Sequence, residues 1–123
     1  MPLGQTTSIV AAIAFLAPLV ACAPHRPSAL TALQLSRDAA PLLRLCPTSQ
    51  SIDQSQWPPS FASSGVRSVY IGHAGLYLET DRSQVQETGV FIPCDAATFI
   101  AAPGKDPDYV EVAKGVFTYH IAG

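Results

Sequence analysis

The sequence has few charged residues. Asp, Glu, Lys and Arg make up 13% of its 123 residues, whereas about 25% is typical of soluble domains. Seven Lys and Arg stand against nine Asp and Glu, so the formal net charge is −2 at pH 7. Nucleic-acid binding calls for a basic patch, and attraction to anionic lipids calls for a cluster of Lys and Arg. The sequence contains neither, so we expect no nucleic-acid partner.

The sequence also lacks the short motifs of common catalytic sites. It contains no Gly-x-Ser-x-Gly, Ser-x-x-Lys, His-Glu-x-x-His or Cys-x-x-Cys pattern. A catalytic site needs a nucleophile, a base and an oxyanion site within mutual reach. The serines instead cluster between residues 48 and 64, where the composition is that of a loop. We therefore predict a protein that is not an enzyme and that carries no cofactor.

No apolar run is long enough to span a bilayer. The run from Ile9 to Val20 has 12 residues, whereas a transmembrane helix needs about 20. Its length fits the apolar core of a signal peptide, and Pro18 suits the cleavage region because proline ends a helix. Residues 1 to 8 contain no Lys or Arg, which departs from the usual signal-peptide pattern.

The apolar run closes with Leu19, Val20, Ala21 and Cys22. This four-residue segment resembles a bacterial lipobox. The resemblance implies cleavage before Cys22, a diacylglycerol on its thiol and acylation of the new amino terminus. More than one acyl chain gives stable membrane anchoring. The alternative is an apolar segment in which Cys22 falls by chance.

The lipobox divides the chain into three parts. We predict a signal peptide over residues 1–21, a lipidated tether over residues 22–27 and one small β-rich domain over residues 28–123. The mature chain has 102 residues, about the size of a single domain. Ala23, rather than an aspartate, follows the cysteine, which favours the outer membrane with the domain facing the periplasm. The expected membrane contact is through lipid on Cys22.

Two further cysteines, Cys46 and Cys94, lie 48 residues apart. An exported protein meets an oxidising compartment, where two such cysteines most simply form a disulfide. The chain-entropy model gives roughly 4 kcal/mol of stabilisation for a loop of this length. A buried thiol pair or half of a metal site are the alternatives.

Hydrophobic spacing predicts a mainly β fold with a short N-terminal helix. Ser28 is placed to cap a helix that runs to Arg37, with Leu30 and Leu33 on one face. The segment from 48 to 64 is predicted to be a loop, with Trp57 as its anchor or as a binding aromatic. Alternation and turn residues predict strands over residues 66–71, 76–80, 89–94 and 98–102, with Leu76 and Leu78 on one face of the second strand and Tyr77 and Glu79 on the other. Residues 81–88 are predicted to form a polar turn. Residues 109–112 and 116–121 are predicted to be one long, kinked strand or a pair, with Gly115 as a bulge, and the whole set indicates a small antiparallel barrel or sandwich.

The strand pattern carries a faint resemblance. Glu79, the segment Phe91 to Cys94 and the segment Tyr109 to Val112 look like the strands of small OB-like domains in bacterial envelope lipoproteins. The resemblance implies an OB-like fold and nothing about function. In the last predicted strand, Phe117 and Tyr119 share a face with Ile121, and this set is predicted to be core. Val116, Thr118 and His120 share the other face, which is predicted to meet a partner, with this terminal strand available for strand addition.

Candidate metal ligands are few. His73 and His120, together with Asp95 or Cys94, have the donor types that zinc or copper prefer, but nothing in the sequence brings them together. Asp106 and Asp108 resemble a fragment of a calcium loop without the spacing of an EF-hand. Exposed turn residues are the simpler interpretation of both sets, so we predict no metal site.

The main hypothesis is a membrane-anchored, non-enzymatic envelope lipoprotein that binds a periplasmic or envelope partner. A more specific alternative is an inhibitor or immunity protein against a cell-wall-degrading enzyme, with residues 72–75 or 103–108 as the inserting loop. A second alternative is periplasmic metal binding through His73 and His120.

Overall fold

A computed structural model describes residues 26–102 and 104–123 of the chain. Cys22, the predicted lipidation site, and the predicted signal peptide lie outside these residues. The described chain forms one antiparallel sheet in the order β1-β2-β3-β4-β6-β5. Its strands are β1 (Gln50–Ser51), β2 (Ser68–Ile71), β3 (Gly75–Ser83), β4 (Gln86–Pro93), β5 (Asp108–Ala113) and β6 (Val116–Ile121).

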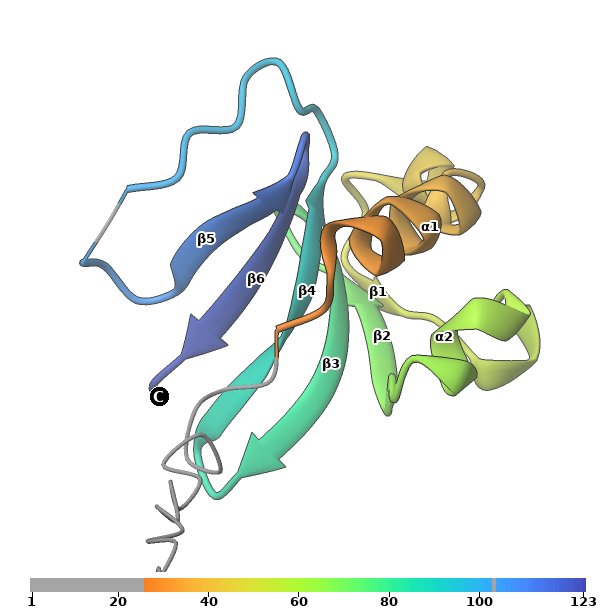
Figure 1. Ribbon diagram of the computed structural model, residues 1–123, viewed down its shortest axis with the longest axis horizontal. Coiled ribbons are helices and arrows are strands. Elements are labelled where there is room, and N and C mark those ends of the chain that lie inside the picture. The colour runs from red at the N-terminus through yellow and green to blue at the C-terminus, as the bar shows by residue number, and fades with distance from the viewer. Residues whose placement is uncertain (1–25, 103) are drawn as a thin grey trace, which may run out of the picture.

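The helical elements lie together on one face of the sheet (Figure 1). They are α1 (Ala29–Ala39), the 3-10 turns η2 (Leu42–Leu45) and η3 (Gln54–Gln56), and α2 (Pro59–Ser63). The predicted mainly β fold with a short N-terminal helix is confirmed. The sheet is not closed, because β1 and β5 are its two ends rather than neighbours.

Helix α1 begins where the sequence predicted, but the face that it packs against the sheet is not the one that carries Leu30 and Leu33. The side chain of Ser28 accepts a hydrogen bond from the backbone N–H of Thr31 at 3.1 Å, as an N-cap does. The face predicted to carry Leu30 and Leu33 is turned to solvent, since the two leucines are 81% and 41% exposed. The helix instead buries Leu35 and two small residues, Ala32 and Ala39, because alanines let its backbone come close to the sheet.

The segment predicted to be a long loop contains ordered structure. It holds β1, η3 and α2, and Phe61 of α2 is fully buried. Pro59 starts α2, a position where proline's missing N–H costs nothing. The indole N–H of Trp57 donates to the carbonyl of Ile52 at 3.1 Å. Trp57 therefore anchors this segment to the core.

The strands of the second half follow the predicted alternation with three differences. β3 and β4 extend through most of the predicted polar turn at 81–88, which shrinks to Gln84 and Val85. The predicted strand at 98–102 is wrong: backbone N–H groups of Thr98 and Phe99 turn back onto the carbonyl of Asp95. Gly115, predicted as a bulge, has a φ of +73° in the turn between β5 and β6.

The predicted disulfide between Cys46 and Cys94 is confirmed, with their Cα atoms 5.8 Å apart. Cys46 directly follows η2, and Cys94 directly follows β4. The bond therefore ties the helical layer to the sheet.

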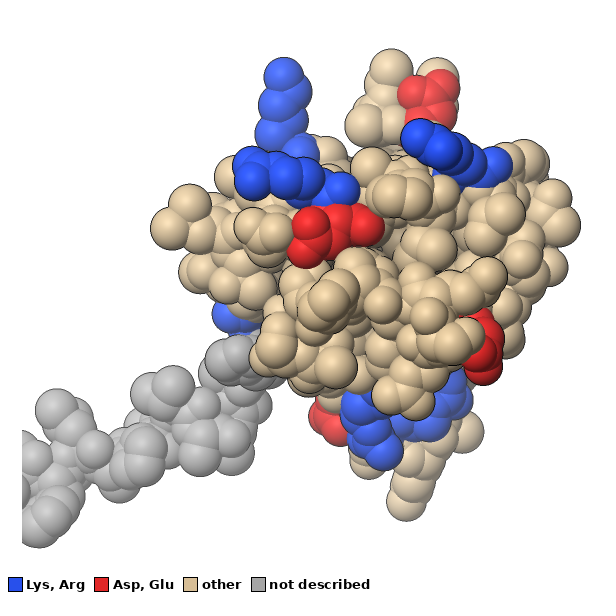
Figure 2. All heavy atoms as spheres, turned by 90° about the vertical axis from the view of Figure 1, so that its right-hand side faces the viewer, with Lys and Arg blue, Asp and Glu red and all other residues tan. Residues whose placement is uncertain are grey.

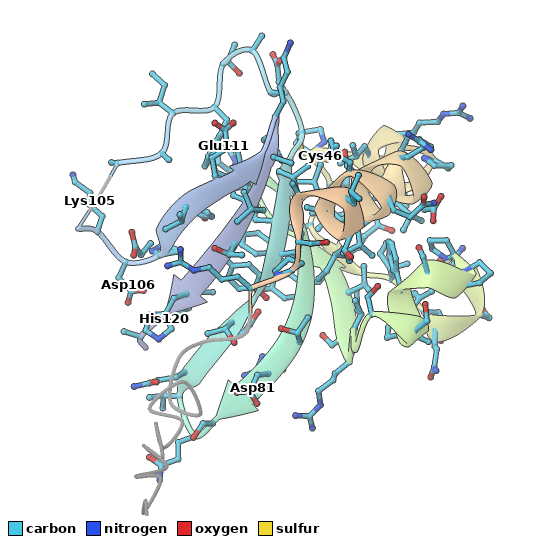
Figure 3. The ribbon with its side chains drawn as sticks, in the orientation of Figure 1. Cys46, Asp81, Lys105, Asp106, Glu111 and His120 are labelled. Atoms are coloured by element: carbon cyan, nitrogen blue, oxygen red, sulfur yellow. A yellow bond between two sulfur atoms is a disulfide. The ribbon has the colours of Figure 1, made fainter. Side chains whose placement is uncertain are left out.

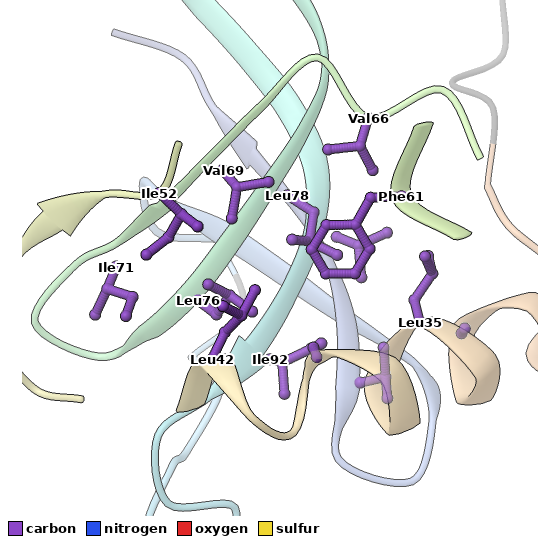
Figure 4. Close-up of a cluster of buried hydrophobic side chains, with 14 residues drawn as sticks. Leu35, Leu42, Ile52, Phe61, Val66, Val69, Ile71, Leu76, Leu78 and Ile92 are labelled. Carbon is purple, nitrogen blue, oxygen red and sulfur yellow. The ribbon is translucent and has the colours of Figure 1, made fainter. Parts of the chain in front are cut away.

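The core between the helices and the sheet is aliphatic (Figure 4). We call this side of the sheet the helix face. Strand residues Leu76 and Leu78 of β3 and Ile92 of β4 meet Leu35 and Phe61 there, all of them buried. Tyr77 and Glu79 alternate with these leucines along β3 and point to the opposite side of the sheet.

Candidate functional site

All four tyrosines of the chain lie on the side of the sheet opposite the helices. They are Tyr70 on β2, Tyr77 on β3, Tyr109 on β5 and Tyr119 on β6. Tyr70 is the cross-strand partner of Tyr77, and Tyr109 is the partner of Tyr119. We call this side, with Phe91 and Phe117 between the tyrosines, the tyrosine face.

The rings of the tyrosine face pack directly on one another. Tyr70 and Tyr77 stack with centroids 4.8 Å apart and planes within 8°. The ring of Tyr119 meets Tyr77 edge-on at 5.0 Å. Phe91, which has no exposed surface, contacts Tyr77, Tyr109 and a third ring, Phe99. Aromatic pairs of this kind stabilise a fold by more than the burial of their apolar surface alone provides.

Two glycines make room for these rings. A Cβ on Gly75 would lie 2.8 Å from the ring of Phe91, and a Cβ on Gly89 would lie 2.9 Å from the ring of Tyr119. Both would also meet backbone carbonyls at 2.4 Å or less. Glycine inside a strand commonly marks such a close approach.

Two buried carboxylates and one arginine lie at one end of the tyrosine face. Arg82 donates to Glu79 at 2.9 Å and to Glu87 at 2.8 Å. Residues three apart on a regular strand point to opposite sides, but the register shifts between Glu79 and Asp81. This bulge turns Arg82 to the same side as Glu79.

The tyrosines complete the hydrogen bonding of Glu87. The hydroxyls of Tyr70 and Tyr119 both donate to its Oε2 atom, and Arg82 donates to its Oε1 atom. The Tyr77 and Tyr109 hydroxyls are 2.8 Å apart. Buried polar groups are thereby satisfied, as a stable interior requires.

Hydrogen bonding and burial shift the pKa values of these groups. The hydrogen bond from Arg82 holds the pKa of Glu79 below its usual value. Desolvation raises the pKa of Tyr70, Tyr77 and Tyr119, and the Glu87 carboxylate raises those of Tyr70 and Tyr119 further. At neutral pH the hydroxyls therefore remain donors. The network holds a fixed set of dipoles and charges, with the half-exposed Arg82 as its outward cation.

A groove of about 280 Å³ lies on the helix face, beyond the start of α1. Its lining includes Thr118 and His120 of β6, two of the three residues predicted to face a partner. The third, Val116, is fully buried. The predicted use of this strand for edge addition is wrong, because β6 pairs with β4 and β5 on its two sides. The long edge strand of the sheet is β5.

The structure separates the candidate metal ligands. His73 lies in the β2–β3 turn beside Cys94 and Asp95, whereas His120 pairs with Thr88 near the other end of β4. Cys94 is held in the disulfide. No three His, Cys, Asp or Glu side chains come together within residues 26–102 and 104–123.

Of the two candidate calcium residues, Asp108 begins β5 opposite His120, and Asp106 holds the end of the chain. Asp106 accepts a hydrogen bond from the backbone N–H of Ala122 at 2.9 Å. Figure 3 shows Asp106 close to His120, at the end of the sheet where the chain finishes. Asp106 therefore has a structural partner of its own.

Comparison with known proteins yields no relative: no family model, no curated protein and no solved structure matches the chain. None of the helices in the described part of the chain is both long and apolar enough to cross a membrane.

Sequence reasoning found only half of the tyrosine face. The shared side of Phe117 and Tyr119 was predicted as core, which agrees with their burial. The link to Tyr70 and Tyr77, and the ion pair with Arg82, were missed. The signal was the pattern of Gly75, Tyr77 and Glu79, which places a glycine, an aromatic ring and a carboxylate on one side of one strand.

Proposed function

We propose that this protein is a lipid-anchored, non-enzymatic lipoprotein of the bacterial cell envelope, whose β domain binds a periplasmic or envelope partner. The observation that carries the proposal is the pair formed by Cys46 and Cys94. It fits the lipobox ending at Cys22, because structural disulfides persist in the oxidising compartments outside the cytoplasm.

The tyrosine face is the proposed partner-binding surface. Tyrosine is enriched in protein interfaces and supplies a large contact at a low entropic cost. Tyr70 and Tyr109 are half-buried, so part of each ring remains available, and Arg82 adds an exposed cation beside them. The hydrogen bonds to Glu87 hold this surface rigid before binding, which lowers the entropy cost of association.

An enzyme of cell-wall degradation is the more specific partner that one observation favours. The β2–β3 turn projects exposed His73, and the backbone N–H of Cys94 donates to the carbonyl of Ala74 at 2.9 Å. The disulfide thus lies directly under the turn. An exposed turn that is held rigid before binding loses less entropy when it inserts into an active site. Protection of a muramidase or amidase substrate, lost in His73→Ala and retained in Ile100→Ala, is the expected result; equal loss in both variants would reject this role.

The first test of the anchor is the intact mass of protein taken from membranes, beside a Cys22→Ala variant. We expect a chain that begins at residue 22 and carries diacylglycerol and a further acyl chain, with both features lost in the variant. An unprocessed, unmodified wild-type chain would overturn the proposal.

The test of the binding surface is photo-crosslinking in cells from a benzophenone amino acid at position 70. The same probe at Ala62, an exposed residue of α2 on the other side of the sheet, is the matched control. We expect a discrete adduct from position 70 alone. Identical patterns from both positions would remove the tyrosine face from the proposal.

A further inference from the structure

Helix α1 exposes the leucines that an ordinary surface helix buries. Leu30 is 81% exposed and Leu33 is 41% exposed, while Ala32 and Ala39 have no exposed surface. Residues three apart lie together on a helix surface, so the two leucines form one apolar patch. The inward side of α1 is already filled, so nothing in the described chain covers this patch.

The side of the molecule that carries the helices also has a broad area without charged side chains. In Figure 2 this tan area fills the middle of the view, below a band of Lys, Arg, Asp and Glu side chains. Leu45 of η2, in the same layer, is 37% exposed. The apolar surface therefore extends beyond a single side chain, and large exposed apolar patches mark interaction sites.

The distance along the chain limits what can cover the patch. Arg26 is only four positions after Cys22, a reach of about 14 Å for a fully extended chain. From Arg26, which borders the groove beside α1, the first turn of the helix follows within three residues. A lipid on Cys22 would hold this turn beside the bilayer surface whatever else the domain binds.

The distribution of charge favours the same contact. Residues 22–45 contain Arg26, Arg37 and Arg44 against one acidic residue, Asp38. Residues 46–123 contain four Lys and Arg against eight Asp and Glu. Basic residues near an anionic bilayer are attracted to it and acidic ones are repelled, so the charges orient α1 toward the lipid.

We propose that α1 lies on the bilayer surface with Leu30 and Leu33 inserted among the lipid headgroups, as the second membrane contact after the lipid on Cys22. The inference rests on the proposed lipid anchor and adds an orientation to it. The helical layer faces the membrane, and the tyrosine face on the opposite side of the sheet faces away from it. Interfacial helices bind in this way, with apolar side chains inward and basic ones at the headgroups.

The test uses tryptophan reporters in the full mature protein. Leu30→Trp is compared with Ile100→Trp, because Ile100 is 86% exposed and lies in the loop after β4, away from the helices. Each lipidated variant is reconstituted into vesicles of phosphatidylethanolamine and phosphatidylglycerol with brominated acyl chains. The wild-type chain, which contains Trp57, supplies the background.

We expect bromine to quench the Leu30→Trp signal severalfold more than the Ile100→Trp signal, and Leu33→Ser added to Leu30→Trp to reduce that difference. Equal quenching at both positions in a protein whose mass shows the lipid would overturn the helix contact and leave the anchor standing. A mass without lipid would overturn both. A dimer in detergent that is lost in Leu30→Ser/Leu33→Ser, with no selective quenching, would assign the patch to a second copy instead and overturn the proposal.

Discussion

The two sides of the sheet are buried by different means. On the helix face, aliphatic strand residues such as Leu76 and Leu78 are covered by α1 and α2. On the tyrosine face, aromatic residues such as Phe91 and Tyr119 are buried largely by one another and by the loop that carries Phe99. The helix face is buried by a second layer of secondary structure. The tyrosine face is buried through the size and the hydrogen bonding of its own side chains.

This difference explains where polar groups are tolerated. Aliphatic side chains offer no hydrogen bonds, so the helix face buries strand residues without charge. Tyrosines bring hydroxyls, and these satisfy the buried carboxylate of Glu87. A sheet side built from tyrosine can therefore hold charge near its surface and remain partly open, which suits recognition.

The largest expected effect tests whether the tyrosine face is a true core. Phe91 and Phe61 have no exposed surface and lie on opposite sides of the sheet. Truncating a buried phenylalanine to alanine typically costs about 3–5 kcal/mol. We expect Phe91→Ala and Phe61→Ala to lower the free energy of unfolding by similar amounts in urea denaturation. A loss below about 1 kcal/mol for Phe91→Ala alone would show that the tyrosine face contributes little to the fold.

The second prediction concerns the covalent tie between the layers. Removing the disulfide with Cys46→Ala/Cys94→Ala releases a 48-residue loop, which costs about 4 kcal/mol in the chain-entropy model. The loss should appear first in the helical layer. We expect faster amide hydrogen exchange in α1 and η2 than in the paired strands β3, β4 and β6. Uniform acceleration over both layers would contradict this.

The sequence predicted those features that depend on local spacing. Alternation separated Leu76 and Leu78 from Tyr77 and Glu79, and the structure places them on opposite sides of β3. Ser28 begins α1 as a cap, and Cys46 pairs with Cys94 as predicted.

Other features depend on tertiary contacts that the spacing of residues along the sequence does not reveal. The period of Leu30 and Leu33 defines a face of α1, but only packing decides that alanines make the closer approach to the sheet. In place of the predicted strand at 98–102, the structure has a turn that begins at Asp95, whose carbonyl accepts hydrogen bonds from the N–H groups of Thr98 and Phe99. The tyrosine network joins Tyr70, Glu87 and Tyr119, which are 17 and 32 residues apart, and a one-residue bulge brings Arg82 into it. Such long-range pairing has no local signature.

The third prediction separates the polar network from the aromatic packing. Glu87→Leu leaves the hydroxyls of Tyr70 and Tyr119 and the guanidinium of Arg82 without their shared acceptor. Leaving buried donors unpaired costs about 1–3 kcal/mol. Glu87→Gln, which keeps one acceptor oxygen, should cost less in the same denaturation measurement. If Glu87→Leu is as stable as the wild type, the network is dispensable and the rings alone hold the tyrosine face.

The smallest expected effect is a dependence of stability on alkaline pH that belongs to the tyrosine face alone. Burial raises the pKa of Tyr119 above the value of about 10 that a tyrosine has in the unfolded chain. The stabilisation is therefore complete below about pH 10 and is lost as the pH rises, because the unfolded chain releases a proton that the folded chain retains. Between pH 9 and 11 one such tyrosine contributes a loss of about 1.4 kcal/mol. We expect Tyr119→Phe to reduce the pH dependence of the unfolding free energy by about that amount, whereas Phe61→Leu on the helix face should leave it unchanged. The same pH dependence in the wild type and Tyr119→Phe would mean that the Tyr119 hydroxyl is open to solvent, and the contrast between the two sides of the sheet would then be one of packing only.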